Sequence, residues 1–394
     1  MNFQNVNSLN NHANLLSGNL LPIGIEQFSI PWLIYYVIVM LIEVIHTIAF
    51  VLGLILAPSE KALQDGTVCA VITLETFFML SRLYTRKTLL EQVVLQMNNI
   101  MQDADETMKN IVKSALKPIT KPFLIYGVVN AISVAIWTVQ PVALAFEKST
   151  FFYVDYNLPA VFSTEPFSVS VLIPSTIIMT IGSVYLFLKK FSVDIYMMHL
   201  VLLLTAQYRY TSVKLTMLFQ DPQNSSDAFP KRRYPISNQW VQRELKALCR
   251  HQNSVLRISV MLRKLLSVNF SLLYINNIFR FCFIGILMIA IPYLTFMEGI
   301  SIFLFAIGSM TQFFLLCFSV QTLSDASTKI TDTAFDEGWY QFEPLIKRTF
   351  LLLIMANNLE CKIAAVDKFN LSLPSFMTIM NQSYSIALLF LRAK

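Results

Sequence analysis

The chain of 394 residues is poor in charge, in paired cysteines and in clustered histidines. Only 14% of its residues are charged, against about 25% in soluble proteins, so an ordinary soluble domain is not expected. The five cysteines show no CxxC spacing and the four histidines are scattered, so no redox motif and no metal site of local spacing is indicated. Residues 1–30 contain no Lys or Arg, so we expect no cleavable signal peptide there.

Motifs of the common enzyme classes are also missing. The sequence has no phosphate-binding loop, no nucleophile elbow and no HExxH, so we expect neither an enzyme nor a bound cofactor or metal. The net charge of +6 suits the cytoplasmic face of a membrane and gives no reason to expect nucleic-acid binding.

Apolar residues dominate the chain instead. Hydrophobic residues make up 55% of it, and several apolar runs reach the roughly 20 residues that cross a bilayer. The predicted fold class is therefore an all-α membrane protein with seven transmembrane helices. The expected spans are residues 31–57, 66–83, 122–146, 169–188, 270–292, 300–320 and 374–391.

Basic residues set the expected orientation, because Lys and Arg concentrate in cytoplasmic loops. With seven spans, all but four of the 30 basic residues fall on one side, the exceptions being Lys61, Lys148, Arg392 and Lys394. The N-terminus is therefore predicted to be cytoplasmic and the C-terminus extracellular. An eighth span at 195–208 is short and would move most basic residues between 189 and 280 to the outside, so we reject it.

This orientation is opposite to that of G-protein-coupled receptors. The expected second external loop, 147–168, also lacks a cysteine, no Asp-Arg-Tyr follows the third span, and no Asn-Pro-x-x-Tyr lies in the seventh. We therefore expect no requirement for a G protein.

The connections on the basic side are predicted to be long helices. Helical patterning runs from 169 to 219, roughly 75 Å at 1.5 Å per residue, against ~30 Å of hydrocarbon. A heptad pattern follows in 240–266, interrupted on one seam by Gln252 and Ser259. Its apolar positions are Val241, Leu245, Leu248, Val255, Leu262 and Leu266. These helices are expected to project into the cytoplasm and pack together; amphipathic helices on the inner leaflet are the alternative.

The spans and connections predict six parts. They are a cytoplasmic N-terminal segment (1–30), spans one to four with a cytoplasmic extension (31–220), a cytoplasmic loop (221–237), spans five and six with an extension (238–320), a cytoplasmic anchor segment (321–373), and the last span with a short extracellular C-terminus (374–394).

The last apolar run has a polar face. Asn381 and Ser385 lie three and seven residues after Thr378, so the three side chains share one side of a helix. In lipid such a face turns toward other helices or toward water. The run therefore either packs within a bundle or lines a narrow pore.

Motifs in the last 60 residues, together with the topology, resemble the insect odorant receptor family. The cytoplasmic part carries Ala334, Gly338-Trp339-Tyr340, Lys347 and the apolar run 351–355. The closing part carries Leu371-Ser372, Phe376, Ser383-Tyr384-Ser385, Leu389 and Arg392. The chain departs from the family pattern at Ala356-Asn357-Asn358, where a basic residue and a proline are common.

The resemblance implies a ligand-gated, non-selective cation channel of four subunits in the plasma membrane of a sensory neuron dendrite. The cytoplasmic helices, with Trp339 and Tyr340, would form the anchor between subunits. The short loop between spans four and five is unlike the large insertion of the family's coreceptor. The chain thus resembles an odour-binding subunit that binds small volatile odorants and opens a central pore with a coreceptor in a heterotetramer. A gustatory-receptor-type channel and a secondary transporter are the alternatives; no internal repeat supports the transporter.

The resemblance also implies an apolar odorant pocket in the outer halves of spans two, three, four and six, a lining that suits volatile ligands. Trp137 is the leading candidate, because it combines a large ring with an indole donor. The full set of candidates is Thr73, Phe77, Phe78, Ser133, Trp137, Ile177, Met179, Phe303 and Phe305. Ordinary helix packing uses the same residue types and is the alternative for each.

In the last span the resemblance places an apolar gate at Ala387 and Leu391, four residues apart. Asn381 and Ser385 are then expected to border a wider polar vestibule. Rings of apolar side chains gate channels by excluding water.

Three acidic or histidine side chains within the predicted spans are candidates for a functional role: Glu43, His46 and Glu75. Glu43 and His46 are three residues apart and are expected to pair with each other. Glu75 is expected to face the interior of the bundle and hold a polar partner.

Overall fold

Long helices make up almost all of the computed structural model, which describes residues 1–6, 8–22, 29–219, 238–290, 296–336, 340, 343–360 and 371–392. The helices are α1 (Phe3–Val6), α2 (Ser8–Leu16), α3 (Ile30–Leu56), α4 (Ser59–Thr85), α5 (Lys87–Gln102), α6 (Glu106–Val139), α7 (Pro141–Leu144), α8 (Val169–Phe219), α9 (Asn238–Ala290), α10 (Phe296–Asp336), α11 (Pro344–Glu360) and α12 (Leu373–Arg392). Strands β1 (Thr150–Phe151) and β2 (Phe167–Ser168) form a short antiparallel hairpin.

Six of the described helices are long and apolar enough to cross a membrane, and they correspond to the first six predicted spans. The seventh predicted span forms α12, a 20-residue helix. It carries the polar residues Thr378, Asn381 and Ser385, which make it less apolar than the other six. The all-α membrane fold is therefore confirmed, and a seven-span count rests on α12 as well.

The helices extend well beyond the spans predicted from hydropathy. Helix α8 has 51 residues and α9 has 53, so each continues the membrane helix as a projection, as the patterning predicted. Residues 195–208 are a buried part of α8 and not a separate span. Helix α6 begins at Glu106, earlier than predicted, and continues through Pro118 and Pro122. Prolines are tolerated in membrane helices because neighbouring groups re-satisfy the freed carbonyls.

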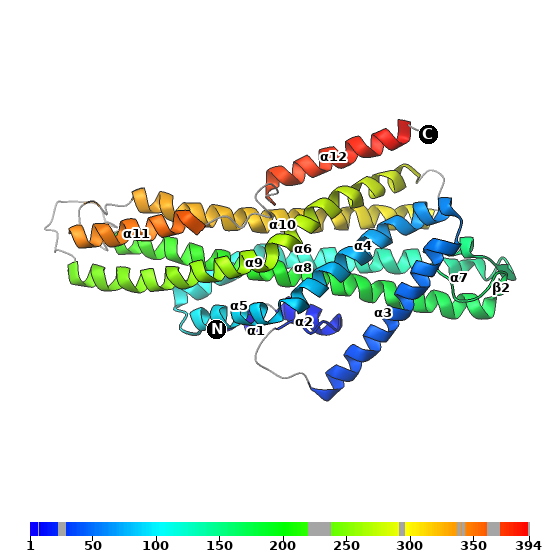
Figure 1. The fold of residues 1–394 in the computed structure, drawn as a ribbon, viewed down its shortest axis with the longest axis horizontal. Helices are drawn as coiled ribbons and strands as arrows, with labels where there is room; N and C mark the ends of the chain where they lie inside the picture. Colours follow the sequence, from blue (N-terminus) through cyan, green and yellow to red (C-terminus); the bar gives the residue numbers. More distant parts are fainter. Residues whose placement is uncertain are drawn as a thin grey trace.

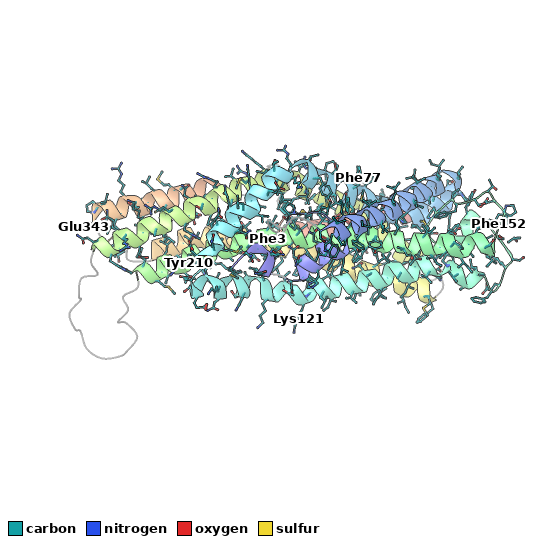
Figure 2. The ribbon with its side chains drawn as sticks, turned by 90° about the horizontal axis from the view of Figure 1, so that it is seen from below. Phe3, Phe77, Lys121, Phe152, Tyr210 and Glu343 are labelled. Atoms are coloured by element: carbon teal, nitrogen blue, oxygen red, sulfur yellow. The ribbon has the colours of Figure 1, made fainter. Side chains whose placement is uncertain are left out.

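The two ends of the molecule differ in kind. Figure 1 shows α11 with the projecting ends of α8, α9 and α10 at one end of the long axis, and α7 with the hairpin at the other. Phe152 and Glu343 mark these opposite ends in Figure 2. The C-terminal end of α12 lies toward the hairpin end (Figure 1).

The heptad pattern of α9 forms a packed seam in the projecting bundle. Its six apolar positions, from Val241 to Leu266, are all buried. Gln252 and Ser259, which interrupt the pattern, are buried too. The hydroxyl of Thr211 on α8 donates to Gln252 Oε1 at 3.0 Å, and Gln252 Nε2 donates to Asn357 Oδ1 of α11 at 3.0 Å. The seam is therefore interior to a bundle of helices.

The departure from the family pattern at 356–358 has a structural reason. Helix α11 continues through these residues to Glu360. Asn357 is buried, and its side chain donates to the carbonyl of Ser327 on α10 at 2.8 Å. This asparagine therefore joins α9, α10 and α11 where a turn was expected.

The N-terminal segment is folded onto the helices, a feature that its sequence did not reveal. The ring of Phe3 packs edge-on against His199 of α8 at 4.7 Å. The Tyr196 hydroxyl donates to the carbonyl of Pro22 at 2.6 Å, and Asn19 Nδ2 donates to that of Lys189 at 3.3 Å. The segment thus covers the middle of α8.

The connection between α7 and α8 closes the hairpin end of the bundle. The Val161 amide donates to the carbonyl of Ala49 on α3 at 3.2 Å. A Cβ on Gly53 would lie 2.3 Å from the backbone of Pro159, so only glycine permits this close approach of loop and helix. Asn157 Nδ2 donates to the carbonyl of Trp137 at 3.1 Å, which fixes the loop to the end of α6.

Candidate functional site

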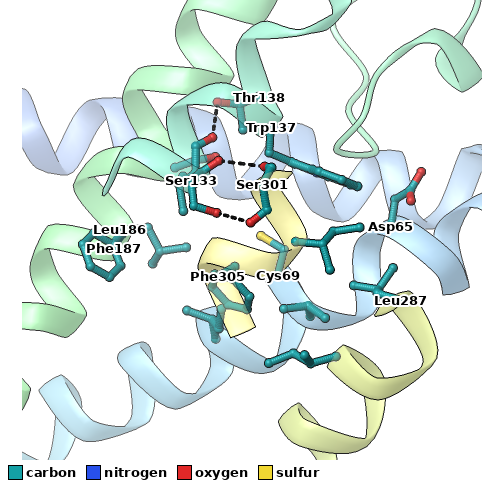
Figure 3. Close-up of a pocket in the computed structure, with 16 residues that line it drawn as sticks. Asp65, Cys69, Ser133, Trp137, Thr138, Leu186, Phe187, Leu287, Ser301 and Phe305 are labelled. Atoms are coloured by element: carbon teal, nitrogen blue, oxygen red, sulfur yellow. Dashed lines mark hydrogen bonds between the residues drawn. The ribbon is translucent and has the colours of Figure 1, made fainter. Parts of the chain in front are cut away.

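Five helices, α4, α6, α8, α9 and α10, line a partly open apolar cavity beneath this connection. Its volume is about 110 Å³. Figure 3 shows the Trp137 ring extending toward Asp65 at one end, with Leu186 and Phe187 at the other. The apolar side chains that line the cavity are Val68, Ile72, Val134, Trp137, Leu186, Phe187, Ile284, Leu287, Ile302 and Phe305.

Few polar groups reach the cavity, and the hydroxyl hydrogens of Ser133 and Ser301 are donated to backbone carbonyls. The Ser133 hydroxyl donates to the carbonyl of Ser301 at 2.7 Å, and the Ser301 hydroxyl donates to that of Ser133 at 3.2 Å (Figure 3). Asp65 pairs with Lys61 at 2.5 Å. A hydroxyl oxygen that has donated its proton can still accept one, so the two serines offer acceptors to a ligand.

Size and polarity together define what this cavity can hold. An apolar protein cavity of about 150 Å³ stays dry and binds benzene. The present cavity therefore suits a small, neutral and mainly apolar molecule. The mainly apolar lining offers binding energy and shape, so the cavity suits recognition of a ligand.

The structure brings three of the nine predicted pocket residues together. Ser133 and Trp137 of α6 and Phe305 of α10 all line the cavity. These three come from two of the four spans predicted to contribute.

The other six predicted pocket residues lie elsewhere. Phe77 is 73% exposed and Phe303 is 52% exposed, and both point away from the bundle, as Figure 2 shows for Phe77. Phe78 and Ile177 are exposed as well. Their aromatic and aliphatic character fits a lipid-facing surface equally well, which is why composition did not separate them.

Two residues miss the cavity for another reason. Thr73 is half-buried and donates its hydroxyl to the carbonyl of Cys69 at 2.8 Å, within its own helix. Met179 is buried in a separate apolar cluster beneath the α7–α8 connection. Neither lines this cavity, because the helical phase of α4 and α8 directs both side chains elsewhere.

A helical stripe on α4 could have indicated the residues of this helix that line the cavity. Asp65, Val68, Cys69 and Ile72 lie at successive spacings of three, one and three residues, so they share one face. Helix α9 also contributes Ile284 and Leu287, although the fifth span was not expected to take part.

The ionisable groups of the first span pair with α8 and not with each other. Glu43 forms an ion pair with Lys189, and His46 Nε2 lies 3.0 Å from the Ser183 hydroxyl. The predicted pairing of Glu43 with His46 is therefore wrong, because each group contacts a partner on α8 instead. Glu75 faces the interior, as predicted, and pairs with Lys190 at 2.6 Å.

Helix α12 packs on α9 through one face and exposes the other. Ala387 is buried, and a Cβ on Gly285 of α9 would lie 3.2 Å from its side chain. Asn381 and Ser385 are exposed. Within one subunit Ala387 thus faces α9, and the polar residues lie on the free face. The side chain of Leu391 lies outside the part of the chain whose side chains are described.

The structure describes one of the two predicted anchor residues. Trp339 lies outside the described residues, and Tyr340 is exposed near the α11 end of the bundle.

The fold and the cavity define a polytopic helical membrane protein with a small apolar cavity. The family model of the 7tm odorant receptors matches residues 61–384, and the chain belongs to this family. The family is one of receptors and not of enzymes.

Individual relatives agree with this assignment. Odorant receptor 85b of Drosophila melanogaster is 23% identical over 176 residues, which cover 44% of this chain and 43% of that protein. Odorant receptor 22c of Drosophila melanogaster is 28% identical over 89 residues, covering 23% and 22%. The matched stretches thus span less than half of these relatives.

The fold is that of a solved insect receptor. The olfactory receptor OR5 from Machilis hrabei in complex with eugenol superposes with a TM-score of 0.76 at 14% identity, covering 98% of this chain and 97% of that one. A second structure of OR5 from Machilis hrabei gives a TM-score of 0.77 at 12% identity, covering 98% of this chain and 97% of that one.

Proposed function

We propose that the chain is the odour-binding subunit of a ligand-gated, non-selective cation channel that opens together with a coreceptor in a heterotetramer. The observation that carries the proposal is the partly open apolar cavity between α4, α6, α8, α9 and α10. A solved receptor of the same fold is described in complex with eugenol, a small aromatic molecule. The expected ligands are therefore volatile, neutral compounds with an apolar body and at most one polar handle.

The pore is proposed to lie along α12, whose free face carries Asn381 and Ser385. Four such faces around an axis would form a polar vestibule, and an apolar ring at Leu391 would close it. Ala387, an expected gate residue, is buried against α9 within one subunit. Leu391 lies one turn later on nearly the same face, so this end of α12 would have to turn toward the axis for the ring to form. The projecting bundle, with Trp339 and Tyr340, would hold the subunits together.

The membrane orientation is proposed to follow the basic residues. The projecting bundle then lies in the cytoplasm, and the α7–α8 connection lies outside the cell with the C-terminus. The expected location is the plasma membrane of a sensory neuron dendrite. The match of this chain to the odorant receptor family model favours this function over that of a gustatory-type channel.

The test is expression of the chain with a coreceptor, the chain alone and the coreceptor alone, followed by current recording against an odour panel. Odour-evoked cation currents are expected only when both subunits are present. Currents from the chain alone would favour a homomeric, gustatory-type channel. If the pair conducts no more than the coreceptor alone for every odour, although both reach the surface, the proposal is wrong.

A further inference from the structure

Directly below the cavity, five helices meet in a buried polar cluster. We call this set the polar cluster; its members are Glu75, Tyr126, Lys190, Asp194, Arg280 and Gln312. All six side chains are buried, and they belong to α4, α6, α8, α9 and α10, the same five helices that line the cavity. Two carboxylates face two cations, so the cluster is balanced in charge.

One carboxylate oxygen is the centre of the cluster. Asp194 Oδ2 accepts from Lys190 Nζ at 3.0 Å, from Gln312 Nε2 at 2.9 Å and from the Tyr126 hydroxyl at 3.2 Å. These three donors come from three different helices. A buried carboxylate needs such partners, because it has lost its hydration.

Arg280 connects this centre to α9. Its guanidinium donates to Gln312 Oε1 at 2.6 Å and lies 3.8 Å from Glu75. Glu75 in turn pairs with Lys190 at 2.6 Å. Arg280 is only 2% exposed, so its charge depends on these partners and a displacement of α9 must change them.

The polar cluster forms the floor of the cavity. Ile72 and Ile284 line the cavity, and Glu75 and Arg280 lie about one turn farther from the hairpin end on the same helices. A direct contact joins the two layers: the ring of Phe187, which lines the cavity, packs against that of Tyr126 at 5.9 Å.

The opposite side of the cluster meets α12. Phe281 and Phe313 directly follow Arg280 and Gln312, and their rings lie 5.8 Å apart. Phe313 also contacts Phe376 of α12, at 5.6 Å. Farther along the same interface, the Ser383 hydroxyl donates to the carbonyl of Ile278 at 3.2 Å. The turns of α9 and α10 that hold the cluster therefore also hold α12.

We propose that the polar cluster transmits occupancy of the cavity to α12, and that Arg280 is the positioning residue that ties α9 to this transmission. The proposal rests on the odour-gated function proposed above. A ligand that displaces Phe187 or Ile284 shifts Tyr126 or α9. Because a buried charge cannot leave its partners without a large cost, the helices move together and α12 moves with them.

The test compares Arg280→Lys and Tyr126→Phe with Glu43→Gln, in cells that also express a coreceptor. Arg280→Lys keeps the charge but loses the planar fork, and Tyr126→Phe removes a single hydroxyl while the ring remains. Glu43→Gln is the matched control, since Glu43 pairs with Lys189, the neighbour of Lys190, and lies outside both cavity and cluster. The readouts are surface number, half-maximal odour concentration and maximal current per surface receptor.

Arg280→Lys is expected to raise the half-maximal concentration at least about fivefold and to lower the maximal current, a range typical of coupled sites. Tyr126→Phe is expected to shift both in the same direction by about threefold. Glu43→Gln should stay within about twofold of the wild type. A purely structural role would lower surface number and leave the concentration dependence of surviving channels unchanged.

The outcomes separate the two proposals. A wild type that never responds to odour overturns the proposed function and this inference with it. A responsive wild type with Arg280→Lys and Tyr126→Phe both matching Glu43→Gln overturns only the inference. If Arg280→Lys does not reach the surface, the isosteric Tyr126→Phe decides.

Discussion

Two phenylalanines of α10 that lie two residues apart have different surroundings, because they are on different faces of the helix. Phe305 lines the cavity, and Phe303, two residues earlier, is 52% exposed. We predict that Phe305→Ala changes the half-maximal odour concentration by about tenfold, because contacts of one large ring contribute more than 1 kcal/mol. Phe303→Ala, the matched control, should leave it unchanged. Dose–response curves at equal surface number test this pair, and equal shifts in both variants would contradict the cavity assignment.

At this scale the sequence predicted residue types better than positions. Trp137, Ser133 and Phe305 reach the cavity. Phe77 and Ile177 do not, because lipid accepts the same side chains as an apolar pocket does. Arg280 was overlooked, although a charge inside the predicted span 270–292 was the clearest available signal of a functional group.

At the N-terminus of α6, the contribution of one capping side chain to stability can be tested directly. Asp105 is its N-cap: the carboxylate accepts from the Met108 amide at 2.8 Å and pairs with Lys214 of α8 at 2.7 Å. We predict that Asp105→Ala destabilises the protein by about 1 kcal/mol, the usual value of such a cap. Asp103→Ala, two residues earlier, is the control. Thermal unfolding of the purified receptor measures both, and equal midpoints would refute the cap.

The charge of this cap persists well below neutral pH. Partial burial raises the pKa of Asp105, but hydrogen bonds from Lys214 and the Met108 amide lower it more, so the pKa lies below its ordinary value. A lowered pKa means that the stabilisation is present above the unfolded-state pKa and is lost as pH falls through the folded-state pKa. The difference between Asp105→Ala and the wild type should therefore shrink in acid.

Helix α12 offers a test of which face meets the pore. Ser385 is exposed and Ala387 is buried against α9. We predict that a water-soluble thiol reagent modifies Ser385→Cys rapidly and reduces the current, with a faster rate when odour is present. Ala387→Cys should react slowly in both states. Fast modification of Ala387→Cys together with an inert Ser385→Cys would mean that the pore uses the opposite face.

Elements were predicted well where one physical signal dominated. The continuous α8 and the buried seam of α9 followed from apolar periodicity alone. The N-terminal helices and the fixed α7–α8 connection did not, because they depend on contacts of high sequence separation, such as Phe3 with His199 and Pro159 with Gly53.

For the whole molecule, orientation in the membrane is the first thing to establish. The C-terminal end of α12 and the β1–β2 hairpin lie toward the same end (Figure 1), and the basic residues favour an extracellular position for it. We predict that an epitope tag after Lys394 stains on intact cells. A tag before Met1 is the control and should stain only after permeabilisation. The reverse pattern would invert the proposed topology.

The central claim is that an odorant bound in the cavity between Trp137 and Phe187 opens a pore along α12. The most direct measurement is an experimental structure of this chain with its coreceptor, bound to the most potent odorant of the panel. The ligand is expected inside the cavity, in contact with Trp137 and Phe305, with the polar cluster intact beneath it and α12 displaced relative to the unbound complex. Ligand density at another site, with this cavity empty and unchanged, would contradict the account.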